Sequence, residues 1–236
     1  MVQMIASETP FLQPKTLRVV FRKVGNLQYI SHLDLMRTMT RVIIRSHIPV
    51  AYSEGFNPIP RLSFAAPLSV GVESLVEIMD IRITHPVHFD VAMASLNENL
   101  PPELRVSEVY MAETKPRDIA FTSYEISLYR DGIDGALVAR VADALSARPL
   151  TVLKKTKTGE KDTDIAPLIE SLSVKMGDGC VSVSVMLRVE NASFLNPDYL
   201  LRALASTEGI FTGEKDKEYY TILRTGFYTA GGERFA

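Results

Sequence analysis

Residues 17–49 read LRVVFRKVGNLQYISHLDLMRTMTRVIIRSHIP, and this stretch decides the fold that we expect for the first half of the chain. Its first part, 17–24, alternates and is rich in β-branched residues, which predicts a β-strand. Ser31 then begins a helix, and Asp34 three positions later gives the pattern of a capping box. Pro49 ends the helix. The apolar helical spacing is carried by Leu33, Met36, Thr40, Ile43, Ile44 and His47.

The rest of the first half completes a familiar order of elements. A loop with glycine and prolines covers 51–64, and an alternating strand is expected at 73–84. A helix from His85-Pro86 to about residue 100 and a strand at 104–112 follow. Strand, helix, strand or loop, strand, helix, strand is the βαββαβ order of ferredoxin-like folds.

The pattern recurs after a polar segment at 112–121. Strands are expected at 122–130, 149–156, 180–189 and 219–228, with helices at 132–148 and 196–205. We therefore predict an α+β protein made of two tandem ferredoxin-like units with antiparallel sheets. The boundaries are a loose leader at 1–14, a first domain at 15–114 and a second domain at 115–236.

The composition is that of a globular cytoplasmic protein. Cys180 is the single cysteine, so no disulfide can form within the chain. The first residues lack the basic start and apolar run of a signal peptide. No stretch of about 18 apolar residues is available to span a membrane.

Charge is distributed unevenly along the first half. Residues 15–61 hold eight basic and two acidic residues, a net charge of +6. Residues 73–118 hold four basic and nine acidic residues, a net charge of −5. This asymmetry predicts one cationic surface that meets an anionic partner.

Three arginines form a row in the first predicted helix. Arg37, Arg41 and Arg45 are spaced by four, which places them along one helical face about 6 Å apart. No acidic residue lies four positions from any of them. Such a row can contact successive phosphates of a nucleic acid. The alternative is a solvated helix face.

The loop after this helix combines aromatic residues with a cation. The loop contains prolines that stiffen it, two aromatic residues, Tyr52 and Phe56, and one cation, Arg61. Aromatic rings can stack on bases and a cation can contact a phosphate, so this combination suits nucleic-acid binding. The alternative is that Phe56 fills the core beneath the loop. The segment 154–161 is also basic and predicts either a nucleic-acid contact or a solvated loop.

The histidines are weak candidates for chemistry. His32, in the first helical turn, could act as a general acid or base, but no carboxylate or nucleophile is placed to assist it. Ser31 beside it is expected to cap the helix. His85 and His88 flank a proline, and their spacing predicts no metal site.

Several classes of enzyme are excluded by missing motifs. The chain has no glycine-rich phosphate loop and no nucleophile elbow. One cysteine cannot hold an iron–sulfur cluster or a cysteine-rich zinc site. We therefore expect no bound cofactor and a protein that is not itself an enzyme.

Two runs resemble a known bacterial family. FRKVGNLQYISHLDLMR (21–37) and IPVAYSEGFNPIPRLSFAAPLSVGVES (48–74) are similar to the radical-SAM-linked proteins, a domain of unknown function encoded beside or fused to a radical SAM enzyme. The resemblance covers about 16–228. It departs from the family at Ile59, where a histidine is frequent, and at Ala166, where a basic residue is frequent.

The resemblance implies a partner that does the chemistry. A radical SAM enzyme carries a three-cysteine cluster motif, which this chain lacks, so the chain would be its accessory. We expect a non-catalytic protein that binds structured RNA (tRNA or rRNA) and presents it for modification. One alternative is a protein-interaction module without RNA contact. Another is a metal-independent endoribonuclease that uses His32, by analogy with the tandem ferredoxin-like CRISPR RNA-processing endoribonucleases.

Overall fold

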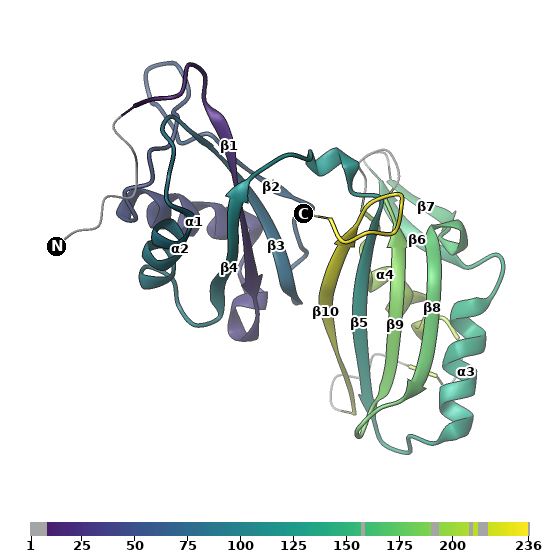
Figure 1. Ribbon diagram of the computed structural model, residues 1–236. Helices are drawn as coiled ribbons and strands as arrows, with labels where there is room; N and C mark the ends of the chain where they lie inside the picture. The colour runs from purple at the N-terminus through teal and green to yellow at the C-terminus, as the bar shows by residue number, and fades with distance from the viewer. Residues whose placement is uncertain (1–8, 157–158, 190–193, 208–209, 212–216, 236) are drawn as a thin grey trace. The chain divides into compact units, whose positions relative to one another are not determined.

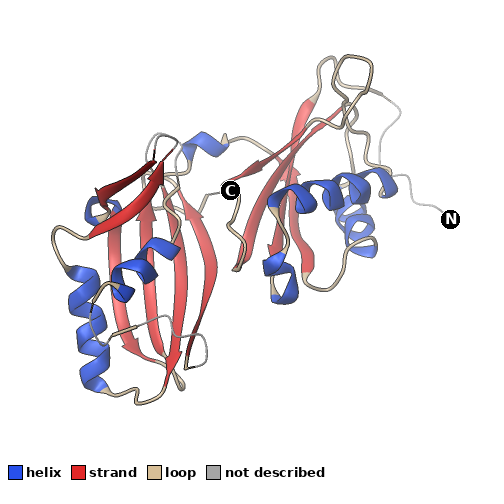
Figure 2. Ribbon diagram, turned by 180° about the vertical axis from the view of Figure 1, so that it is seen from behind, coloured by secondary structure: helices blue, strands red, loops and turns tan. Residues whose placement is uncertain are grey.

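The computed structural model describes residues 9–156, 159–189, 194–207, 210–211 and 217–235. The described chain divides into two compact units, one ending at Pro116 and the other running from Arg117 to Phe235 (Figure 1). Within each unit, helices lie against one face of an antiparallel sheet (Figure 2). Among the described segments, no helix combines the length and the hydropathy that a membrane span needs.

The first unit has the ferredoxin-like order of elements. They are β1 (Lys15–Lys23), η1 (Gly25–Tyr29), α1 (His32–Arg45), β2 (Leu62–Ala65), β3 (Val72–Ile83), α2 (Phe89–Glu98) and β4 (Leu104–Met111). The strands lie in the order β4-β1-β3-β2, and every neighbouring pair is antiparallel. In the register of the central strands, Val19 lies opposite both Met79 and Val109.

Helix α1 begins at the predicted cap, but it ends at Arg45, four residues before the predicted stop at Pro49. The Ser31 hydroxyl oxygen accepts a hydrogen bond from the Asp34 backbone N–H at 3.1 Å, which satisfies one of the free donors of the first turn. The helix ends at Arg45, and His47 follows in the left-handed region with φ of 54°. The buried face of the helix is Leu35, Met39, Val42 and Ile43.

This buried face differs from the predicted one. Of the predicted apolar set, only Ile43 belongs to the core, while Leu33 and Ile44 are about half exposed, at 52% and 49%. The helix carries two apolar stripes, and only one can face the sheet. Burial of a large apolar side chain contributes about 1.5–3 kcal/mol, so the stripe with fully buried Met39 and Ile43 fixes the helix to the sheet.

Helix α2 begins at Phe89 and not at His85-Pro86 as predicted. Backbone hydrogen bonds at Thr84 explain the difference, because they extend the chain there. Its N–H donates to the Pro49 carbonyl at 2.8 Å, and its carbonyl accepts from Phe11 at 2.7 Å. Phe11 also packs against the core, so this part of the predicted leader is attached to the unit, while residues 1–8 lie outside the described residues.

The second unit repeats the same order with an insertion. Its elements are η2 (Pro116–Asp118) at the boundary, then β5 (Phe121–Arg130), α3 (Gly135–Ser146), β6 (Thr151–Thr156), β7 (Gly159–Asp164), η3 (Ala166–Leu168), β8 (Ile169–Met176), β9 (Val181–Arg188), α4 (Asp198–Ala205) and β10 (Glu218–Tyr228). The sheet runs β10-β5-β9-β8, again with antiparallel neighbours. The chain is therefore an α+β protein of two tandem ferredoxin-like units, as predicted.

The predicted strand at 149–156 does not belong to this sheet. It forms β6, which pairs with β7 in a separate hairpin inserted between α3 and β8. The second strand of the sheet is β8, which was not among the predicted strands. This strand lies at the sheet edge, and all eight of its residues are exposed or half exposed. Its apolar alternation is short, because only Leu172, Val174 and Met176 alternate with polar residues.

Candidate nucleic-acid interface

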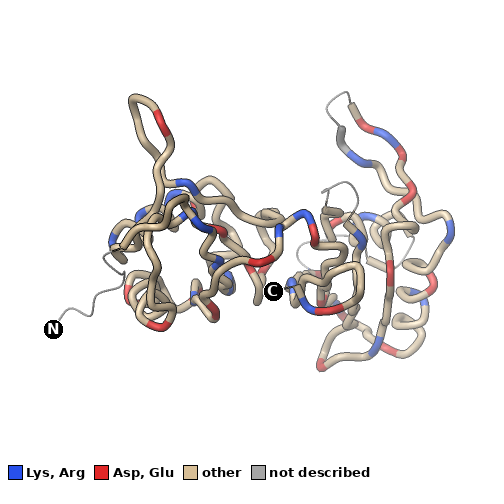
Figure 3. The backbone as a smooth tube through the Cα atoms, turned by 45° about the horizontal axis from the view of Figure 1, so that its top comes forward, with Lys and Arg blue, Asp and Glu red and all other residues tan. Residues whose placement is uncertain are grey.

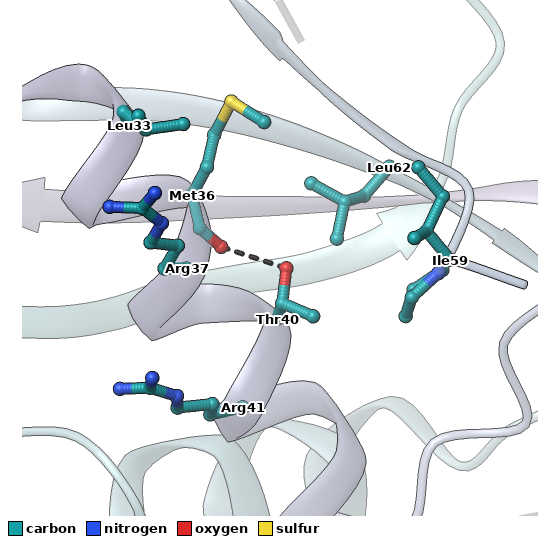
Figure 4. A pocket seen from close by; sticks show the side chains of 8 residues that line it. Leu33, Met36, Arg37, Thr40, Arg41, Ile59 and Leu62 are labelled. Atoms are coloured by element: carbon teal, nitrogen blue, oxygen red, sulfur yellow. Dashed lines mark hydrogen bonds between the residues drawn. The ribbon is translucent and has the colours of Figure 1, made fainter. Parts of the chain in front are cut away.

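A groove lies between α1 and the residues that lead into β2. It has a volume of about 400 Å³, and we call it the α1 groove (Figure 4). Its lining residues are Leu33, Met36, Arg37, Thr40, Arg41, Ile59, Pro60 and Leu62. The helix therefore supplies one wall from the apolar stripe that does not face the sheet, and the loop supplies the other.

The lining of the α1 groove is apolar between its two arginines. Thr40 is the one hydroxyl there, and it donates a hydrogen bond to the Met36 carbonyl at 2.8 Å, as Figure 4 shows. The hydroxyl is thus occupied within the helix. Leu33 and Ile59 are 52% and 65% exposed, so ligand atoms can reach both walls. Such a surface favours a flat apolar group with a charged attachment.

The loop that forms the second wall is held in shape at its base. Tyr52 and Pro60 form an antiparallel bridge. Ser53 donates its backbone N–H to the Ile59 carbonyl at 2.9 Å, and its hydroxyl oxygen accepts the Ile59 N–H at 3.1 Å. Gly55, with φ of 125°, turns the chain at the tip, and the loop stands out from the body of the unit (Figure 3).

The three predicted arginines are exposed along α1, and two of them line the groove. Arg37 and Arg41 flank it, and Arg45 follows one turn later. No acidic residue lies four positions from these arginines, but one lies three positions away, because Arg37 Nη1 is 3.2 Å from Asp34 Oδ1. Both side chains are about 60% exposed, so the pair contributes little. Arg41 and Arg45 form no ion pair with any residue in the part of the chain that the structure describes.

The carboxyl of Asp34 is tied into the same helix turn. Hydrogen bonds from the Ser31 hydroxyl at 2.7 Å and from Arg37 lower the pKa of Asp34 below its ordinary value. The carboxylate is therefore kept ionised at the start of α1, where the helix dipole also favours negative charge.

The two aromatic residues of the loop are exposed. Phe56 is fully exposed, so it does not fill the core beneath the loop, and Tyr52 is 46% exposed. Neither lines the α1 groove. Arg61 lies between two groove residues, Pro60 and Leu62, without lining the groove itself. The roles predicted for these three residues therefore lie beside the groove and not inside it.

The basic count of residues 15–61 overstates the cationic surface. Arg18 is fully buried and makes a bidentate contact to Asp80, at 2.7 and 3.0 Å. Lys23 is 3% exposed and donates to the Val72 carbonyl at 2.8 Å. Both cations serve the interior of the unit, so the expected +6 surface is smaller and centres on α1.

His32 and His85 each contact a neighbouring side chain of the first unit. The His32 ring meets the Phe64 ring edge-on, with centroids 5.4 Å apart at 90°. Among the described residues, no carboxylate or nucleophile forms a hydrogen bond with His32. His85 Nδ1 lies 2.9 Å from the Thr84 hydroxyl. In the part of the chain that the structure describes, no group of three or more His, Cys, Asp or Glu could hold a metal ion.

The sequence signal for the groove was present but was read as core. Leu33, Met36 and Thr40 have helical spacing, and a 14-residue helix with two apolar stripes leaves one without a partner in its own unit. The sequence did not predict that Ile59 and Pro60 lie beside this stripe, because their position depends on the path of the loop.

The fold and the groove define the class: a tandem ferredoxin-like protein with an apolar groove flanked by arginines. The chain matches the family described as "Uncharacterized protein conserved in bacteria (DUF2344)" over residues 16–197, and it belongs to that family. The match begins within β1, includes the whole α1 groove and ends just before α4.

Comparisons with other proteins add little. No curated protein matches the chain. A crystal structure of an unknown protein from Galdieria sulphuraria is 11% identical, covering 90% of this chain and 99% of that one, with a TM-score of 0.26. A putative glycine cleavage system transcriptional repressor is 8% identical, covering 91% and 99%, with a TM-score of 0.23. Scores of this size support no statement about function.

Proposed function

We propose that this chain is a non-catalytic RNA-binding protein that holds RNA at the α1 groove. The observation that carries the proposal is the pairing of Arg37 and Arg41 with an apolar groove of about 400 Å³. Arginines on successive helix turns suit successive phosphates, and an apolar groove of this size accepts an unstacked base.

The projecting loop extends this surface. Phe56 is fully exposed, and nothing in its own unit covers it. An exposed aromatic ring can stack on any of the four bases. Arg45 and Arg61, both exposed, lie beyond the groove and would contact further phosphates. Tyr52 at the base of the loop offers a second ring.

The resemblance of 21–37 and 48–74 to radical-SAM-linked proteins supplies the context of the proposal. The chain would hold structured RNA, tRNA or rRNA, in the cytoplasm for a radical SAM enzyme to modify. Cys180 is the single cysteine and is buried, so the iron–sulfur cluster would belong to the partner.

The test is the salt dependence of RNA binding. Fluorescence anisotropy with labelled bulk tRNA and a labelled single-stranded RNA, at several salt concentrations, gives the dissociation constant and its salt slope. Arg37→Gln with Arg41→Gln should weaken binding and lower the slope by about 1.4, since each phosphate contact with a single strand contributes about 0.7.

The matched control is Arg117→Gln with Lys175→Gln, two exposed cations of the second unit. This control should leave the slope within about 0.3 of the wild-type value. Absence of wild-type binding at low salt, or equal losses in the two double variants, would overturn the proposal.

A protein-interaction module is the second candidate, and the exposed apolar residues favour it. Leu33, Phe56 and Ile59 are all more than half exposed, and the cationic rim would meet an acidic patch of the enzyme. Co-purification with the radical SAM enzyme after nuclease treatment tests this reading. Phe56→Ser that loses the enzyme but keeps RNA affinity would favour it over RNA binding.

A further inference from the structure

Hairpin β6–β7 and helix α4 belong to the second unit (Figure 1), and α4 contacts β6. Each of the two elements places a basic side chain against one tyrosine, Tyr199. Lys154 on β6 lies with Nζ 6.0 Å from the Tyr199 ring centroid. Arg202, one turn further along α4, lies with Cζ 5.0 Å from the same centroid. Tyr199 is therefore approached by cations from two separate elements.

The hairpin adds a third cation to this cluster. Lys154 is directly opposite Lys161 in the β6–β7 register. Directly opposite residues of an antiparallel pair project from the same face, and like charges in that position destabilise the pair. Val152, two residues before Lys154, is buried, so this face of the hairpin is the one turned toward the body of the unit.

The acidic residues of the hairpin lie on its other face. Glu160 and Asp162 alternate with Lys161 along β7, and successive side chains of a strand point to opposite faces. Figure 3 shows both basic (blue) and acidic (red) positions along this hairpin. The strand alternation thus separates the charges, with Lys154 and Lys161 on the face toward α4.

One carboxylate partly offsets the cluster. Asp198 accepts from Arg202 Nε at 2.8 Å and from the Tyr220 hydroxyl at 3.4 Å. Lys154, Lys161, Arg202 and Asp198 together keep a net charge of +2. Burial raises the pKa of Tyr220, and the Asp198 carboxylate raises it further, so the phenol stays neutral beside the carboxylate.

We propose that this cluster is a second RNA-contact site, which binds phosphate groups of the RNA backbone. An anion bound between Lys154 and Lys161 would reduce the repulsion between their positive charges, and the Arg202 guanidinium adds a planar hydrogen-bond donor. The Tyr199 ring already meets two cations, so the site recognises charge and not a stacked base. This inference rests on the RNA binding proposed above.

Removal of the facing lysines tests the site in the full-length chain. Lys154→Gln with Lys161→Gln should raise the dissociation constant for labelled single-stranded RNA and lower the salt slope by about 1.4. The same variant should keep or raise the unfolding midpoint in urea, because a like-charge pair is removed. Loss of affinity would then not come from misfolding.

The matched control neutralises the opposite face of the hairpin. Glu160→Gln with Asp162→Asn should keep or tighten RNA binding, since it removes negative charge outside the site. The inference is overturned if the lysine variant binds RNA with the wild-type constant and slope while the Arg37 and Arg41 variant is weakened. In that case the proposed function stands.

Other outcomes separate the two proposals. If the lysine variant loses affinity and the Arg37 and Arg41 variant does not, the second-unit site is supported and the groove is rejected. If the wild-type chain binds no RNA at low salt, both are rejected.

Discussion

Arg18 shows how a charge in the sequence can have a purely structural role. It lies in the middle of β1, fully buried, and its guanidinium is held by Asp80 on β3 and by the Thr114 hydroxyl at 2.6 Å. Burial alone would lower the pKa of Arg18, but the hydrogen bond and charge of Asp80 raise it above its ordinary value. Arg18 therefore stays positively charged inside the unit, and the Asp80 carboxylate stabilises this buried charge.

Loss of Asp80 should consequently be costly. Asp80→Asn leaves a buried guanidinium without its counter-charge, and we expect the free energy of unfolding to fall by about 3 kcal/mol. Urea denaturation followed by circular dichroism measures it. Asp143→Asn, at an exposed position of α3, should change the value by less than about 0.5 kcal/mol. Similar small losses in both variants would contradict the structural role.

Ser31 controls both the start of α1 and the titration of Asp34. Ser31→Ala removes the cap and should lower the free energy of unfolding by about 1 kcal/mol. The hydrogen bond from Ser31 is the largest cause of the depressed pKa of Asp34, so this pKa should rise toward its ordinary value. Side-chain NMR titration of Asp34 in wild type and variant measures the shift.

The sign of the pH effect follows from the direction of that shift. A carboxyl whose pKa is depressed in the folded state stabilises the fold above its unfolded pKa of about 3.9, and the contribution is lost as pH falls through the folded pKa. Ser31→Ala should therefore reduce the acid dependence of stability in this range. An unchanged Asp34 titration in the variant would show that Ser31 is not its partner in solution.

At the scale of elements, α1 serves two surfaces with two apolar stripes. Met39 is fully buried against the sheet, whereas Leu33 is 52% exposed in the groove wall. Met39→Ala should lower the free energy of unfolding by about 2–5 kcal/mol, because it leaves a cavity in the core. Leu33→Ser should cost at most about 1 kcal/mol and should weaken RNA binding.

Urea denaturation and RNA anisotropy on the same two preparations separate these effects. Stability loss without change in affinity is expected for Met39→Ala as long as the variant remains folded. Equal destabilisation by both substitutions would mean that the Leu33 stripe is also core, which would remove the groove.

The sequence predicted the strands correctly where one face of a strand is regularly buried, and it predicted them less well elsewhere. β5 alternates buried and half-exposed residues along its length, and its bounds came within one residue of the prediction. β8 is an edge strand with the sequence IESLSVKM, in which the apolar residues Leu172, Val174 and Met176 alternate with polar ones, but no residue is fully buried and the register shifts between Ile169 and Ser171. The burial of Arg18 was invisible because a strand pattern does not show what covers its second face.

At the scale of the whole molecule, the two units share a topology, but the connection between their first helix and second sheet strand takes a different form in each. The segment between the first helix and the second sheet strand is a projecting loop in the first unit and hairpin β6–β7 in the second. The loop forms a wall of the α1 groove, and the hairpin carries Lys154 and Lys161. Both proposed RNA contacts thus depend on the same topological position, which the ferredoxin-like core leaves free to vary.

This symmetry of position leads to a prediction for the complete chain. If one RNA molecule contacts both sites, the four substitutions Arg37→Gln, Arg41→Gln, Lys154→Gln and Lys161→Gln combined should lower the salt slope by about 2.8, twice the effect of either pair. Effects at separate sites add when they share no partner groups, so the losses in binding free energy should also add to within about 0.5 kcal/mol. Anisotropy titrations of the wild type, the two double variants and the quadruple variant provide all the terms. A quadruple variant with the slope of the groove variant alone would show that the hairpin lysines do not touch the RNA that the groove holds.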